Sequence, residues 1–166
     1  MQRMLDFGVG TGRILVHFLP FALERCGVDI TPDALAWTSR TLGGYAHLQR
    51  TEPEPPLPFP DAHFDLILAT SVFTHLAYAA QPAWIRELAR VPRPGGSILA
   101  TFHARVPSSA GARGWHERHE DRGIHRRTYL SRAKVVELWS ATLPVVDVDM
   151  PAEGQALLMA SKPEAR

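Results

Sequence analysis

Short continuous apolar runs alternate along the chain with longer segments in which apolar residues recur at helical spacing. Each short run is typical of a buried strand, and each longer segment is typical of a helix with one apolar face. In the first half the pattern predicts a strand over residues 3–7, a helix over 11–18, a strand over 26–30, a helix over 31–42 and a weaker strand over 45–50. Strand followed by helix is therefore the repeating unit.

The second half continues the alternation and then departs from it. Residues 64–70 form the most apolar run, and we expect them to be the central strand of a sheet that is covered on both faces. After them the pattern predicts a helix over 82–91, a strand over 97–102, a polar stretch over 105–127, a helix from Ser131 to 140, and strands over 145–149 and 156–160. The last two strands are too close in sequence for a crossover helix, so they should pair antiparallel. This order predicts a doubly wound α/β sheet with helices on both faces.

Length and composition narrow the function classes. The 166 residues suffice for one domain, and 18 Lys+Arg against 17 Asp+Glu give a net charge of +1. Such a chain has no overall field to attract nucleic acid or an anionic membrane. The single cysteine, Cys26, cannot form an internal disulfide, and no apolar run approaches the ~20 residues of a membrane helix. We therefore expect a cytoplasmic protein with neither a nucleic-acid nor a membrane partner.

A glycine-rich motif, LDFGVGTGR, lies where the first strand meets the first helix. Gly8, Gly10 and Gly12 allow a ligand to approach the backbone, and the helix start offers free N–H groups. Arg13 stands where the dinucleotide fingerprint requires its last glycine. Asp6 would repel a pyrophosphate but attract an amine. The motif therefore favours a ligand with a cationic group over a dinucleotide, although a glycine turn with only a folding role has the same appearance.

Asp29 ends the second predicted strand, seventeen residues after Gly12. A carboxylate at this point can accept hydrogen bonds from both hydroxyls of an adenosine ribose. An aspartate before Thr31 and Pro32 also fits a simple turn or helix-capping role. Both interpretations remain open from Asp29 alone.

In combination these residues resemble the class I S-adenosylmethionine-dependent methyltransferases, and in particular their type 11/12-like domains. In that family the strand-end acid and the G-x-G-x-G loop hold the methionine end of the cofactor, and the second strand-end acid binds the ribose. Three further stretches are similar to the family: LPFPDAHFD at 57–65, SVFTHL at 71–76 and LARVPRPGG at 88–96. The resemblance extends from residue 4 to about 102. It implies a Rossmann-like, mostly parallel seven-stranded sheet with the last strand antiparallel, and S-adenosyl-L-methionine as cofactor.

The resemblance also implies which residues bind the cofactor. A polar residue after the third strand contacts adenine in the family, and here Thr51 or Glu52 is the candidate. Ile30 follows the ribose-binding acid, and Thr70 and Ser71 follow the central strand. The expected cofactor-binding residues are Asp6, Gly8, Gly10, Gly12, Asp29, Ile30, Thr51, Glu52, Thr70 and Ser71.

His75 follows the central strand by five residues and is the candidate catalytic residue. As a general base it would take a proton from a hydroxyl or amine nucleophile during methyl transfer. Alternatively it caps the short turn 71–76, because transfer to a deprotonated nucleophile needs mainly proximity and orientation.

The polar stretch WHERHED, followed by His125, contains residue types that bind metals. In a helix His116 and His119 would share one face, but no sulfur ligand accompanies them and arginines flank them. We therefore expect no metal here, but a solvated loop that contacts substrate. Its arginines would then steer an anionic substrate; they are Arg113, Arg118, Arg122, Arg126 and Arg127.

Residues 1–166 are thus expected to form one methyltransferase-like domain: a cofactor half (1–102), a variable substrate segment (103–130) and a closing helix with two strands (131–162). The expected function is methyl transfer from S-adenosylmethionine to an unidentified, small-molecule acceptor. The alternative is a catalytically degenerate or truncated cofactor-binding module that acts through a partner. Because the first strand begins almost at Met1, we expect a second copy or a partner chain to cover the exposed N-terminal side of the sheet.

Overall fold

The structure is a computed structural model that describes residues 2–103, 106–119, 126–151 and 154–164. Its strands are β1 (Gln2–Phe7), β2 (Leu23–Asp29), β3 (His47–Arg50), β4 (Phe64–Ala69), β5 (Pro92–His103), β6 (Trp115–His119), β7 (Arg126–Leu130), β8 (Val145–Asp149) and β9 (Gln155–Ser161). The α-helices are α1 (Pro32–Leu42), α2 (Gln81–Arg90) and α3 (Arg132–Ser140), and the 3-10 helices are η1 (Leu15–Phe18), η2 (Tyr78–Ala80) and η3 (Ser108–Arg113).

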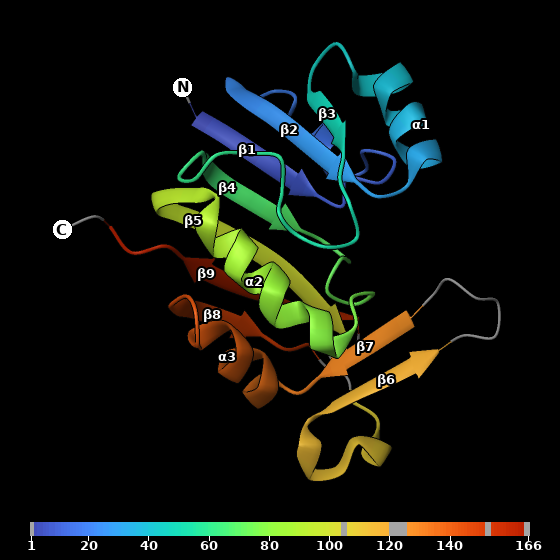
Figure 1. The fold of residues 1–166 in the computed structure, drawn as a ribbon, viewed down its shortest axis with the longest axis vertical. Coiled ribbons are helices and arrows are strands. Elements are labelled where there is room, and N and C mark those ends of the chain that lie inside the picture. The colour runs from blue at the N-terminus through green and yellow to red at the C-terminus, as the bar shows by residue number, and fades with distance from the viewer. Residues whose placement is uncertain (1, 104–105, 120–125, 152–153, 165–166) are drawn as a thin grey trace.

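All nine strands belong to one sheet, in the order β3-β2-β1-β4-β5-β7-β6, with β9 beside β5 and β8 beside β9 (Figure 1). β1 to β5 are parallel, whereas β9 runs antiparallel to β5 and to β8. The predicted α/β class, the central position of β4 and the antiparallel closing strand are therefore confirmed. The sheet has two strands more than the predicted seven because residues 103–130 contribute β6 and β7.

Helices cover both faces of this sheet, as predicted. Successive strand residues point to opposite faces, so Met4 and Leu5 belong to different cores. Met4 belongs to the core that includes Leu35 of α1, whereas Leu5 belongs to the core that includes Trp84 of α2 and Trp139 of α3. Figure 1 shows α2 and α3 side by side on the face toward the viewer. Both tryptophans are buried, as expected of apolar residues at helical spacing on the inner face of a helix.

The helix predicted over residues 11–18 is shorter than expected. Only Leu15–Phe18 is helical, as the single 3-10 turn η1. Gly12 has a positive φ of 78°, which an α-helix does not accommodate, so the glycine loop extends further than the apolar pattern indicated. In contrast, α1 begins after Thr31 and α3 after Ser131, whose side chain accepts a hydrogen bond from the Lys134 backbone N–H.

A proline-rich connection leads from β3 to β4 and is fixed by Glu87 of α2. The Glu87 carboxylate is 7% exposed and accepts hydrogen bonds from the Leu57 backbone N–H (2.6 Å) and from Arg90. Burial alone would raise the pKa of Glu87, but these bonds from Arg90 and Leu57 lower it below its ordinary value. The connection is thereby held against α2, with Thr51 and Pro53 facing the sheet edge described below.

Candidate functional site

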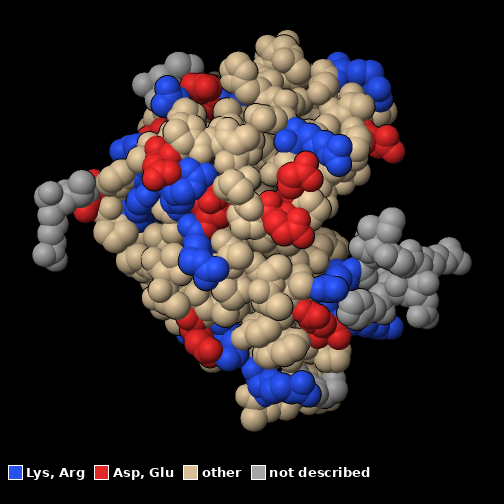
Figure 2. Space-filling view, viewed as in Figure 1, with Lys and Arg blue, Asp and Glu red and all other residues tan. Residues whose placement is uncertain are grey.

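A cavity of about 670 Å³ lies at the carboxyl ends of β1, β2 and β4, where parallel sheets bind ligands. The space-filling view shows the molecule hollowed at this edge, between the part that carries α1 and the part that carries β6 and β7 (Figure 2). Most of the predicted cofactor-binding residues line this cavity; they are Asp6, Gly8, Gly10, Asp29, Ile30, Thr51, Thr70 and Ser71. The candidate catalytic residue His75 also lines it.

The glycine loop turns tightly above the end of β1. Gly8 and Gly10 have φ values of 80° and 52°, a region that favours glycine. A Cβ on Gly8 would collide with Val72, whereas a Cβ on Gly10 would enter open space in the cavity wall. Gly12 lies outside the cavity lining; a Cβ there would come within 2.6 Å of Leu42 Cδ1. Gly12 therefore serves the close packing of the loop on α1.

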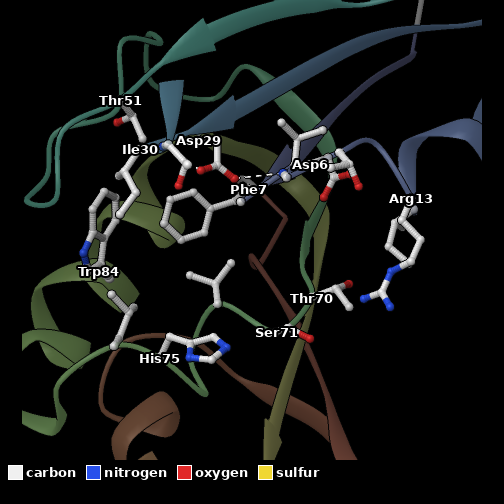
Figure 3. A pocket seen from close by; sticks show the side chains of 18 of the residues that line it. Asp6, Phe7, Arg13, Asp29, Ile30, Thr51, Thr70, Ser71, His75 and Trp84 are labelled. Carbon is white, nitrogen blue, oxygen red and sulfur yellow. Dashed lines mark hydrogen bonds between the residues drawn. The ribbon is translucent and has the colours of Figure 1, made fainter. Parts of the chain in front are cut away.

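Asp29 fixes the loop from the neighbouring strand. One carboxylate oxygen accepts from the Gly10 N–H at 2.8 Å and the other from the Thr31 N–H at 2.8 Å. The carboxylate faces the cavity between these bonds (Figure 3). The turn role considered for Asp29 is thus real, and it leaves the acceptor positions on the cavity side available to a ligand.

Asp6 is a buried acid whose charge is poorly compensated. It is 2% exposed, and its Oδ2 has no hydrogen-bond partner among the described residues. Burial, and secondly the charge of Asp29, raise the pKa of Asp6 to about 7, although a bond from the Leu15 backbone N–H opposes them. A ligand cation beside Oδ2 would relieve this cost.

Thr51, Ile30 and Trp84 form the opposite end of the cavity (Figure 3). Thr51 Oγ1 is buried without a partner among the described residues, whereas Glu52 is exposed and does not line the cavity. Trp84 contacts Phe7 with ring centroids 4.8 Å apart and donates from Nε1 to the Pro53 carbonyl at 3.2 Å. The sequence gives no sign that Trp84 borders the cavity, because a helical apolar stripe does not show which of its members does so.

Ser71 occupies a strained backbone conformation just after β4, with φ of 62°. Its N–H donates to Thr101 Oγ1 at 2.7 Å, Thr101 donates to Gln155 Oε1 at 2.6 Å, and Gln155 Nε2 donates back to Ser71 Oγ at 2.9 Å. Side chains of β5 and β9 thus hold the turn that forms this rim of the cavity. Nothing in the local sequence around Ser71 indicates these two distant partners.

His75 connects the cavity to β7. Its Nδ1 lies 3.0 Å from the Arg126 carbonyl oxygen, which can only accept, so Nδ1 carries the hydrogen. In the neutral ring Nε2 then has a lone pair. Through this bond the side chain contacts β7. Thr128 completes the attachment, since its N–H donates to Thr74 O at 2.8 Å and its hydroxyl to Leu76 O at 2.7 Å.

The segment predicted as a solvated loop folds as the antiparallel pair β6 and β7. Trp115 stacks on Tyr78 with centroids 4.3 Å apart, and Tyr129 stacks on His103 at 4.6 Å. His116 and His119 lie on a strand, not a helix. No cluster with metal-ligand composition occurs among the described residues. Glu120, Asp121, Arg122 and His125 lie outside them, so their predicted roles are not described.

Comparison with known proteins agrees with this fold. Residues 5–100 match a family described as a methyltransferase domain. The uncharacterized methyltransferase YcgJ of Bacillus subtilis is 31% identical over 107 residues, which cover 61% of this chain and 41% of YcgJ. The chain spans 36–41% of the length of the first curated relatives it matches.

Solved structures share the fold at low sequence identity. The 1,6-didemethyltoxoflavin-N1-methyltransferase of Burkholderia thailandensis, with bound 1,6-didemethyltoxoflavin and S-adenosylhomocysteine, has a TM-score of 0.78 at 18% identity, covering 98% of this chain and 71% of that chain. The [4+2]-cyclase SpnF has a TM-score of 0.79 at 18% identity, covering 99% and 76%.

A doubly wound sheet with a glycine loop and two strand-end acids at its carboxyl edge is the architecture of a class I S-adenosylmethionine-dependent methyltransferase domain. Because the family match covers more than half of its residues, this chain belongs to the methyltransferase domain family. S-adenosyl-L-methionine is its cofactor. The cavity suits this molecule, since a buried unpartnered carboxylate matches its amine and the open wall at Gly10 admits it against the backbone. No helix of the described residues is long and apolar enough to cross a membrane.

Proposed function

We propose that this chain transfers the methyl group of S-adenosyl-L-methionine to a small-molecule acceptor. The observation that carries the proposal is the buried Asp6 carboxylate, with Oδ2 unpartnered among the described residues, beside the glycine loop. An acid at this depth is costly in the empty protein and useful only when a cation binds to it. The cofactor's amine supplies such a cation.

The other cofactor contacts follow from the two ends of the cavity. Asp29 accepts hydrogen bonds from the ribose, and the loop from Gly8 to Gly10 passes beneath the methionine part. Ile30 and Trp84 enclose the adenine, with the unpartnered Thr51 hydroxyl as a polar contact. Thr70 and Ser71 lie away from Thr51 and Ile30 (Figure 3), and we assign this end of the cavity to the methionine part and to the entry of the acceptor. Glu52 is left out of this assignment because it is exposed and does not line the cavity.

The bound cofactor supplies an electrophilic methyl group on sulfur. The protein's part is to hold the acceptor atom in line with that methyl group and to exclude water. His75 takes the acceptor's proton at Nε2 when the nucleophile is a hydroxyl or an amine. The Nδ1–H bond to the Arg126 carbonyl fixes the tautomer that this role requires.

A small acceptor is supported by the distribution of charge. On the face shown in Figure 2, basic and acidic side chains are interspersed, without a field of one sign that would hold a nucleic acid. The part of the molecule that carries β6 and β7 borders the hollow (Figure 2), so we assign residues 103–130 to acceptor recognition within a single domain of cofactor half, substrate segment and closing strands. The buried Cys26 thiol suits a cytoplasmic location.

Isothermal titration with S-adenosylhomocysteine tests the proposal first. Binding by the folded chain is expected, and absence of binding would contradict the proposed function. Incubation of the protein with labelled S-adenosylmethionine and fractionated cell extract then identifies the acceptor. In that assay His75→Ala should lower turnover at least about tenfold and leave cofactor affinity unchanged; unchanged turnover would restrict His75 to holding β7.

A binding module that acts through a partner is the second candidate, and one observation favours it. Apolar side chains are exposed on the sheet face opposite α2 and α3, namely Leu157 (42%) and Met159 (36%). A second copy or a partner chain would cover this face. Light scattering of the purified chain tests the homodimer, and Met159→Lys should then yield a monomer. A monomeric wild-type chain that binds cofactor and methylates no acceptor would support a heterologous partner.

A further inference from the structure

Arg13 carries the one permanent positive charge among the described residues that line the cavity. It follows Gly12, and its side chain extends across the rim toward Thr70 (Figure 3). Two carboxylates, Asp6 and Asp29, line the same cavity, yet no ion pair joins Arg13 to either of them in the described structure.

The two acids are held away from Arg13 by other bonds. Asp29 accepts from the backbone N–H groups of Gly10 and Thr31, both at 2.8 Å. Asp6 is 2% exposed and accepts from the backbone N–H of Leu15. Negative charge is therefore fixed deep in the cavity and positive charge at its rim, and the two do not neutralise each other.

A ligand that matches this arrangement carries both charges on one small group. The methionine part of the cofactor does so, because its ammonium and its carboxylate are attached to the same carbon. We propose that the Arg13 guanidinium, with the Thr70 hydroxyl beside it, binds the cofactor's α-carboxylate while Asp6 receives the ammonium. This inference rests on the proposed function. A guanidinium is suited to the role because its forked N–H donors match the two oxygens of a carboxylate.

An acidic acceptor molecule could also supply a carboxylate to Arg13. Binding measurements with two forms of the cofactor, one of which lacks the carboxylate, distinguish the cofactor from such an acceptor. The ligands are S-adenosylmethionine and decarboxylated S-adenosylmethionine, which keeps the ammonium and the sulfonium but lacks the carboxylate. Each is titrated calorimetrically into the full wild-type chain, Arg13→Gln, and Arg86→Gln. Arg86 is an exposed residue of α2 outside the cavity lining, so its variant removes the same charge elsewhere.

The wild type is expected to bind S-adenosylmethionine roughly tenfold or more tightly than the decarboxylated form. Arg13→Gln should bind the two forms within about twofold of each other, with the decarboxylated form bound as by the wild type. Arg86→Gln should keep the wild-type preference. Arg13→Lys should restore part of it, because an ammonium keeps the charge but loses the fork.

Three results would overturn the inference. If Arg13→Gln keeps the full preference, the carboxylate is bound elsewhere and Arg13 is left for an acidic acceptor. If Arg13→Gln weakens both ligands equally, its effect is on the loop and not on the carboxylate; melting temperatures of all variants accompany the titrations. If the wild type binds neither ligand, the proposed function fails and the inference fails with it.

Discussion

Replacing Asp6 with asparagine tests the electrostatic basis of the site, because it removes the charge and keeps the size of the side chain. Burial and the charge of Asp29 raise the pKa of Asp6 to about 7 from the ordinary 3.8. A shift of about three pH units corresponds to roughly 4 kcal/mol. The empty protein bears this cost at every pH above about 7, where Asp6 is ionised although buried.

The sign of the pH dependence follows from proton binding. Between about pH 4 and pH 7 the folded state holds a proton on Asp6 that the unfolded state has already released. The contribution of Asp6 to the free energy of unfolding therefore falls as pH rises through this range and is constant above it. Asp6→Asn lacks this contribution. At pH 8 and without cofactor the variant should be more stable than the wild type, by up to roughly 4 kcal/mol.

Cofactor affinity should change in the opposite direction. A hydrogen bond between charged groups contributes about 1.5–3 kcal/mol, so Asp6→Asn should bind S-adenosylhomocysteine about tenfold to a hundredfold more weakly at pH 8. Wild-type affinity should also decrease as pH falls below about 7, because the protonated acid no longer attracts the ammonium. The variant should lack this decrease.

Urea unfolding followed by circular dichroism measures the first effect, and titration calorimetry between pH 6 and 8 measures the second. Asp33→Asn, at an exposed acid in the first turn of α1, is the matched control and should leave affinity unchanged. The reasoning is refuted if Asp6→Asn destabilises the empty protein at pH 8, or if it binds S-adenosylhomocysteine as tightly as the wild type does.

Three further substitutions probe the scaffold of the site. Gly8→Ala should lower stability by at least about 1 kcal/mol and weaken S-adenosylhomocysteine binding, because the positive φ of Gly8 and the Val72 side chain leave no room for a methyl group. Gly44→Ala is the control, since a Cβ there has open space, and it should change neither property. Thermal unfolding and calorimetry measure the two effects. Glu87→Gln should lower the free energy of unfolding by about 1–3 kcal/mol at pH 7. The lowered pKa of Glu87 stabilises the fold above pH 4.5 and this stabilisation is lost as pH falls below that value, so the difference from the wild type should shrink in acid; a difference independent of pH would contradict the charge argument. Gln155→Leu removes a hydrogen bond to Ser71 and should therefore weaken cofactor binding, or raise the KM for the acceptor, by at least about threefold. Gln155→Glu should recover less than half of this loss. Kinetics equal to those of the wild type would show that the Ser71 turn keeps its conformation without the bond from β9.

The arrangement of the sheet could be predicted because short apolar runs and segments of helical spacing alternate along most of the chain. The run 64–70 is apolar on both faces and became β4 at the sheet centre, and the short gap before residue 156 required an antiparallel return. The start of α3 at Ser131 follows from local chemistry alone. In each case one physical constraint dominates, and no distant residue competes with it.

Strands β6 and β7 could not be predicted in the same way. Arg126 and Arg127 interrupt the alternation of apolar and polar residues that would identify β7 as a strand. In addition, the Thr128 N–H of β7 donates to the Thr74 carbonyl, fifty-four residues earlier in the sequence. Which of Thr51 and Glu52 lines the cavity depends on which residue the fold buries. Such facts arise from pairing between remote segments, and neither composition nor periodicity contains them.

The hydrogen-bonded ring of Ser71, Thr101 and Gln155 joins residues up to 84 positions apart. During synthesis the glycine loop, Asp29 and β4 leave the ribosome long before β9 does. The nascent chain therefore has the glycine loop and the two acids of the cavity early, but the rim at Ser71 is completed only when β9 inserts between β5 and β8. The geometry of this rim therefore depends on a strand that is made long after the glycine loop, so a fault in the insertion of β9 would alter the cavity without touching β1 or β2.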